Sequence, residues 1–268
     1  MTLIARNKIL TSYCIVSIIF LLGFLLLFLV TFFTGGRFYL PIKLEFSNIS
    51  IQSLFFNNFT IFPIISTIFF GIYAVTTSSI IRYTFEKTQS PEIIFFFGFL
   101  IGCLFELLRL LIPILNLWDN YSTLVIFIGK TLFAGRLISI ICFLFSSIFV
   151  QESQGQETER NLLIIIVVSC IFAEFIPVNA GKISSSLLPE IGFYTILYFV
   201  TGLVFIITVI TLYFTEKKSR ILGFVFLYLG YISLTYSSNF LFCTLGIIFT
   251  TLGTKYYLEN LHNYYLWK

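Results

Sequence analysis

Long apolar stretches separated by short polar breaks follow one another along the whole chain. A helix that crosses a bilayer needs about 20 apolar residues, and the first run, from Ile9 to Phe33, is long enough and lacks the cleavage site of a signal peptide. The pattern predicts an all-α, multi-pass transmembrane bundle without a soluble domain, a single integral-membrane domain over residues 1–268. Eight spans are expected, at about residues 9–33, 62–82, 91–115, 122–150, 162–178, 189–214, 221–236 and 240–257.

The last two predicted spans come from one apolar stretch, Ile221 to Tyr257, which is too long for a single crossing. At about 1.5 Å per residue a helix of this length would measure roughly 55 Å, whereas the hydrocarbon core is about 30 Å thick. We therefore predict a break at residues 237–239, which read Ser-Ser-Asn. The alternative is a seven-span bundle, in which this stretch holds one span and a re-entrant or interfacial piece and the C-terminus lies outside.

Composition supports a membrane location and narrows the range of partners. The chain is 58% hydrophobic and 10% charged, with a mean hydropathy of +1.01, whereas about 25% of a soluble domain is charged. The lipid bilayer is the expected surrounding, and with a net charge of only +4 nucleic acid is not an expected partner. The five cysteines lie in apolar runs without metal-site spacing, so neither a metal nor another cofactor is expected.

Lysine and arginine are unevenly distributed over the predicted loops, and this distribution sets the orientation. If both termini lie inside, the outer segments hold only Arg37, Lys43 and Lys182. The inner segments then hold Arg6, Lys8, Arg82, Lys87, Arg160, Lys217, Lys218, Arg220, Lys255 and Lys268. The N-terminus is therefore predicted inside, and the excess of Phe, Ile, Tyr and Asn favours a bacterium with an AT-rich genome, hence the bacterial cytoplasmic (inner) membrane.

Five charged residues lie inside predicted spans and away from the span ends, where a charge is unfavourable unless it has a partner, water or a function. Glu106 and Arg109 lie on the third span, Lys130 and Arg136 on the fourth, and Glu174 on the fifth. Counted from the outer ends of the spans, Arg136 is the deepest. We expect Glu106 to pair with Lys130 or Arg136, and Glu174 to pair with Arg109 or Lys130.

Two acids and three bases leave one positive charge in the membrane. Such a charge favours an outward-facing polar pocket that binds a small anionic ligand, with Arg136 as its principal residue and Glu106, Arg109, Lys130 and Glu174 as the other candidates. The alternative is that all five are structural ion pairs, with Lys130 and Arg109 reaching outward to the membrane surface.

One face of the third predicted span is suited to close helix packing. Gly98, Gly102 and Glu106 recur every four residues, which places both glycines and the acid on roughly the same side of the helix. Small residues at this spacing let the backbone of a neighbouring helix approach closely. We therefore expect a tight helix pair beside the charged residues.

Known intramembrane enzyme chemistries lack their residues in this chain. Asp119, in a loop, is the only aspartate and His262 the only histidine, which excludes an aspartyl pair, the zinc motif H-E-x-x-H and a membrane Ser–His dyad. We therefore expect a non-enzymatic sensor or accessory subunit, which contacts a cytoplasmic or membrane protein partner through residues 151–161 and 215–220. The alternatives are a small secondary transporter or channel-like protein and a purely structural membrane protein.

Overall fold

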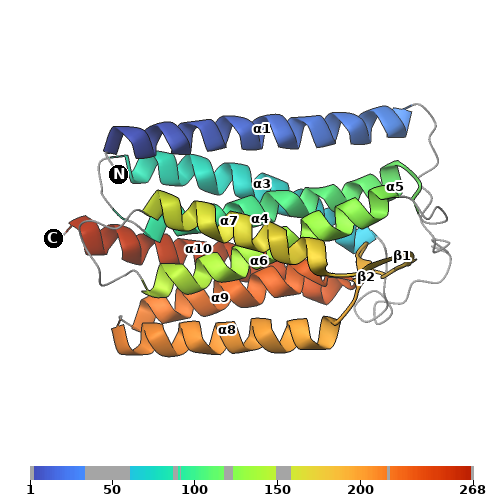
Figure 1. Cartoon of the computed structure of the whole chain (residues 1–268). Coiled ribbons are helices and arrows are strands. Elements are labelled where there is room, and N and C mark those ends of the chain that lie inside the picture. The colour runs from blue at the N-terminus through green and yellow to red at the C-terminus, as the bar shows by residue number, and fades with distance from the viewer. Residues whose placement is uncertain are drawn as a thin grey trace.

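The computed structural model describes residues 3–33, 61–86, 90, 92–117, 123–148, 158–215 and 218–266, which form an all-α bundle with one small hairpin (Figure 1). The helices are α1 (Leu3–Phe33), α3 (Ile61–Thr84), α4 (Glu92–Phe105), the 3-10 helix η2 (Glu106–Leu110), α5 (Leu111–Ile114), α6 (Thr123–Ile148), α7 (Thr158–Phe175), α8 (Tyr194–Thr215), α9 (Lys218–Thr235) and α10 (Phe240–Leu266). Because α4, η2 and α5 are continuous, the described residues hold eight helical segments, one for each predicted span.

Five of these segments are long and apolar enough to cross a membrane. They are Arg6–Thr31, Ile61–Thr84, Glu92–Ile114, Thr123–Ser146 and Phe240–Asn263. Shorter apolar helices cover Tyr198–Phe214 and Arg220–Thr235. Apolar side chains on α1 and α8, at opposite edges of the bundle in Figure 1, are exposed, as at Ile19 and Phe199. Helices that are apolar on their outer faces suit contact with lipid.

The central helix of the bundle is α4, which is buried along nearly all of its length. Phe95, Phe99 and Leu100 have no exposed surface. The ring of Phe99 lies 4.4 Å from that of Phe143 on α6 and 5.5 Å from that of Tyr231 on α9, measured between centroids. Aromatic contacts therefore connect α4 to α6 and α9.

The predicted close packing of the third span is confirmed between α4 and α6. A Cβ atom added to Gly102 would lie 1.8 Å from Ser139 Oγ and 2.4 Å from the carbonyl oxygen of Gly135. At Gly98 the added atom would lie 2.2 Å from Cys142 Sγ. Only a hydrogen side chain fits at these positions, so the two helix backbones approach each other closely directly beside Glu106.

The break predicted at residues 237–239 is present, and it separates α9 from α10. Residues 236–239 are non-helical, and Ser237 Oγ donates a hydrogen bond to Ser66 Oγ at 2.7 Å. The two helices then pack tightly, since a Cβ atom on Gly230 would lie 2.5 Å from the backbone nitrogen of Thr250. Helix α10 continues to Leu266, past the predicted end at residue 257.

Between α7 and α8 the chain forms a β-hairpin that the sequence analysis did not predict. Strand β1 (Val178–Ile183) pairs antiparallel with β2 (Pro189–Ile191), with Val178 opposite Ile191. The predicted start of the sixth span at residue 189 and the predicted end of the fifth span at residue 178 are therefore wrong. Pro177 disfavours helical geometry at the residue before it, so α7 ends at Phe175. Phe193, with a φ of 59°, forms the turn before α8 begins at Tyr194.

The start of the first helix and the end of the last helix lie on the same side of the bundle. Figure 1 shows the start of α1 and the end of α10 at one end, and the hairpin at the opposite end. Several predicted loop features lie outside the described residues: the loop over residues 34–60, the polar break at residues 118–120, most of the partner segment 151–161, and residues 216–217 of the segment 215–220.

Candidate functional site

One carboxylate in the middle of the bundle pairs with two arginines. Glu106 and Arg109 lie on η2, and because a 3-10 helix has about three residues per turn, side chains three apart in the chain are aligned. Glu106 Oε2 forms an ion pair with Arg109 Nη2, and Arg136 Nε on α6 donates to Glu106 Oε1 at 3.0 Å. Glu106 and Arg109 are 1% and 0% exposed, and Arg136 is 8% exposed. We call these three residues the triad.

The triad is also connected to the end of α9. Arg109 Nη1 donates a hydrogen bond of 2.8 Å to the carbonyl oxygen of Thr235, the last residue of that helix. The last carbonyl groups of a helix have no partner within the helix, so a buried guanidinium satisfies one of them here. A single residue thus connects Glu106 to the break between α9 and α10.

The five candidate residues form two groups and not one. Lys130 Nζ lies 2.5 Å from Glu174 Oε2 in a pair whose side chains are 25% and 71% exposed, apart from the triad. The Glu106–Arg136 and Glu174–Lys130 pairs are among those predicted. The expectation that Arg109 reaches outward is wrong, because η2 turns its side chain inward onto Glu106.

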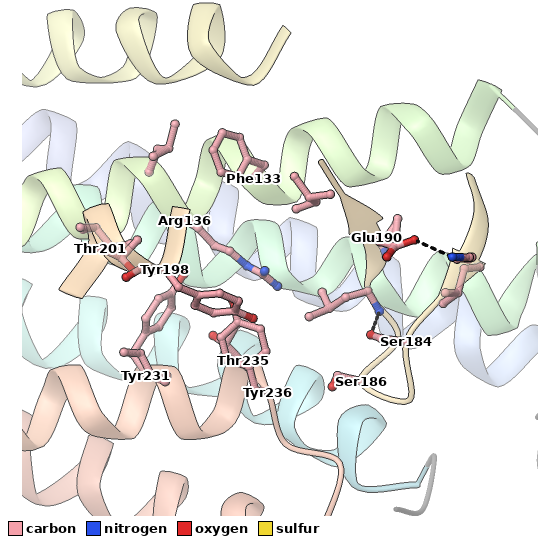
Figure 2. A pocket seen from close by; sticks show the side chains of 18 of the residues that line it. Phe133, Arg136, Ser184, Ser186, Glu190, Tyr198, Thr201, Tyr231, Thr235 and Tyr236 are labelled. Atoms are coloured by element: carbon pink, nitrogen blue, oxygen red, sulfur yellow. Dashed lines mark hydrogen bonds and ion pairs between the residues drawn. The ribbon is translucent and has the colours of Figure 1, made fainter. Parts of the chain in front are cut away.

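A cavity of about 450 Å³ opens beside the triad, between α6, α8, α9 and the hairpin (Figure 2). Arg136 is the triad residue that lines it. Helix α9 contributes Tyr228, Tyr231, Ile232 and Thr235, which share one face because they are spaced by three, four and seven residues. The cavity is lined mainly by apolar and aromatic side chains, as are small-molecule sites of this size.

The guanidinium of Arg136 extends from α6 toward tyrosines of α8 and α9 (Figure 2). Its central carbon lies 5.5 Å from the ring centroid of Tyr236, which in turn lies 5.4 Å from the ring of Tyr198. Arg136 Nη2 and Thr235 Oγ1 are buried and have no hydrogen-bond partner among the described residues. Residues that line the cavity therefore hold buried donors that the described protein groups leave unused.

The hairpin forms the wall of the cavity at the end of the bundle away from the termini. Ser184, Ser186 and Leu188 line it, and Leu188 N donates to Ser184 Oγ at 3.3 Å. Lys182 and Glu190 stand at its edge as an exposed pair, with Nζ 3.7 Å from Oε2. This wall and the tyrosines were missed by sequence reasoning, although the prolines at 177 and 189 with Gly181 between them were signals of a turn-rich segment.

A second buried ion pair lies at the other end of α4, beside the ends of α9 and α10. Arg220 Nη2 lies 3.4 Å from Glu92 Oε1, and the hydroxyl of Tyr265 donates to Glu92 Oε2 at 2.7 Å. The sequence analysis placed Arg220 in an inner segment between two spans, and in the structure the packing of three helix ends buries it to 2% exposure.

The two arginines of the triad are suited to binding an anion. An arginine keeps its charge at all relevant pH values, so it donates hydrogen bonds and attracts anions but does not act as a general acid or base. Among the described residues no group of three or more His, Cys, Asp or Glu residues is placed to hold a metal ion. Comparison of the chain with family models, curated proteins and solved structures finds no significant match.

Proposed function

We propose that this chain is a non-enzymatic sensor or accessory subunit of the bacterial cytoplasmic membrane that binds a small anion beside Arg136. In this proposal all eight helical segments cross the bilayer, with both termini inside and the hairpin outside. The location of the ends of α1 and α10 on one side of the bundle supports an even number of crossings (Figure 1). The excess of Lys and Arg in the segments at that side supports its inner location.

The observation that carries the anion proposal is the unused donor of Arg136. Arg136 lines a cavity of about 450 Å³, and its buried Nη2 atom has no hydrogen-bond partner among the described residues. The triad combines one acid with two bases and so carries one net positive charge. A net charge in a low-dielectric interior is unfavourable, and a bound anion would neutralise it and accept the free hydrogen bond.

The sensor role follows from the two connections of the triad. Arg136 lines the cavity and donates to Glu106 through Nε, while Arg109 joins Glu106 to the end of α9. An anion that draws the Arg136 guanidinium toward the cavity weakens its bond to Glu106 and strengthens the Glu106–Arg109 pair. Binding of the anion in the cavity thereby changes the contact between Arg109 and the α9–α10 break. A partner protein that contacts this break would respond to the change.

Thermal unfolding of the purified protein in lipid nanodiscs, with and without a panel of small anions, tests this function. We expect at least one anion to raise the melting temperature of the wild type but not of Arg136→Gln. The matched control is Arg82→Gln, which removes an exposed arginine at the end of α3 and should respond like the wild type. If no anion acts through Arg136, the triad is a structural ion-pair cluster and the binding function is wrong.

A further inference from the structure

We infer that the ligand of this site is an aromatic monocarboxylate, with its carboxylate on Arg136 and its ring among the tyrosines of α8 and α9. This inference rests on the proposed function and adds the chemical class of the ligand to it. Three features of the cavity carry it: the charge of its surroundings, the side chains of its walls, and its size.

The net positive charge of the site favours a ligand that carries one negative charge. The triad contributes one positive charge, and the Lys182–Glu190 pair at the edge of the cavity contributes none. A monoanion brings the sum to zero, whereas a dianion leaves an uncompensated negative charge in the membrane interior, which is unfavourable. Carboxylate also suits the available donors, because its two oxygens can accept from Arg136 Nη2 and Thr235 Oγ1, which are among the buried groups without hydrogen-bond partners in the described part of the chain.

The side chains that line the cavity favour a ligand with an aromatic group. Tyr198 on α8 and Tyr228, Tyr231 and Tyr236 on or directly after α9 line the same space. Tyr198 and Tyr236 have ring centroids 5.4 Å apart and are inclined by 51°, beside the Arg136 guanidinium (Figure 2). A ligand ring that enters here meets ring faces and edges, an arrangement that favours aromatic over aliphatic groups.

The remaining walls are mainly apolar and leave room for a compact ligand only. Phe133, Leu137 and Ile140 of α6 line the cavity together with Leu188 of the hairpin segment. A volume of about 450 Å³ lies in the lower part of the range of small-molecule sites, about 300–1,000 Å³. An inorganic anion would leave most of this apolar surface uncovered.

The test measures binding of matched probes to the full chain in nanodiscs by titration of the melting temperature. The probes are 3-phenylpropionate, its neutral amide, acetate, octanoate and the dianion phenylmalonate. We expect 3-phenylpropionate to half-saturate at a concentration at least about tenfold below that of acetate, because burial of the phenyl group adds affinity. The amide should bind at least about tenfold more weakly than the acid, since it carries no charge for Arg136.

Two tyrosines of α8 supply a matched pair of variants. Tyr198 lines the cavity and Tyr213 is not among the residues that line it. The two residues are 49% and 67% exposed, so their replacement should not unfold the protein. Tyr198→Ala should weaken binding of 3-phenylpropionate severalfold and leave that of acetate unchanged. Tyr213→Ala should change neither.

The outcomes separate this inference from the function on which it rests. If acetate binds through Arg136 as tightly as 3-phenylpropionate, the aromatic ligand class is wrong while the anion-binding function stands. Tighter binding of octanoate overturns the aromatic body in favour of an acyl chain, and tighter binding of phenylmalonate overturns the single charge. If no probe and no inorganic anion acts through Arg136, both proposals fail.

Discussion

Glu106 accepts a hydrogen bond of 3.0 Å from Arg136 Nε, although the two residues lie 30 positions apart on different helices. The same carboxylate pairs with Arg109, its neighbour on η2. One acid therefore serves two buried bases, and the three residues are not equivalent. Removal of the acid leaves two like charges together in the membrane interior, whereas removal of Arg136 leaves a neutral pair.

We expect Glu106→Gln to destabilise the protein far more than Arg136→Gln. The acid variant leaves Arg109 and Arg136 without their counter-charge, and such a loss typically amounts to roughly 3–5 kcal/mol. Arg136→Gln retains the Glu106–Arg109 pair, so its free energy of unfolding should fall clearly less. Thermal unfolding of both variants in the same nanodiscs measures the difference, and equal losses would show that the triad does not share one carboxylate.

The glycine face of α4 supports a second prediction. Gly102→Ala would place a methyl group against Ser139 Oγ and the backbone of Gly135, so we expect a loss of about 1–3 kcal/mol from forced separation of α4 and α6. Gly202→Ala on α8 is the matched control, because nothing lies within 4 Å of its added carbon. The control should be neutral or stabilised by up to about 1 kcal/mol. Unfolding by a denaturing detergent compares the two.

The buried Glu92–Arg220 pair should show strong coupling between its partners. Both side chains are 2% exposed or less, so each single change to glutamine leaves the opposite charge in an apolar surrounding. We expect a double-mutant cycle to give a coupling energy of about 0.5–3 kcal/mol. The exposed Lys255–Glu259 pair, 3.9 Å apart, is the reference and should give about 0–1 kcal/mol. A coupling no larger than this reference would contradict the burial of the pair.

Cysteine labelling tests the eight-span arrangement. In a background without the five native cysteines, Lys182→Cys on the hairpin should react with a membrane-impermeant maleimide added to intact cells. Asn263→Cys near the end of α10 should react only after permeabilisation. Labelling of both positions in intact cells would support the seven-span alternative, in which the C-terminus lies outside.

The helical segments could be predicted from the sequence, and their ends could be predicted less well. Apolar runs of membrane-spanning length identify helices because the thickness of the bilayer determines the length of the run. The break at residues 237–239 followed from the same length argument. The hairpin was missed because its residues show no apolar periodicity, and its pairing depends on the position of α6 beneath it, where Val178 and Pro189 pack on Gly129.

The sequence by itself determined that this chain is a bundle of apolar helices that hold more basic than acidic residues away from their ends, and it identified the carboxylates that could compensate that charge. The distribution of charge over the cavity and the buried pairs was decided by tertiary structure alone. Arg109 turned inward because η2 aligned it with Glu106, and Tyr198 and Tyr236 came together because α8 packs beside α9. Helix formation depends on neighbours in the chain, whereas a pocket depends on how separate helices rotate and pack, which no local pattern records.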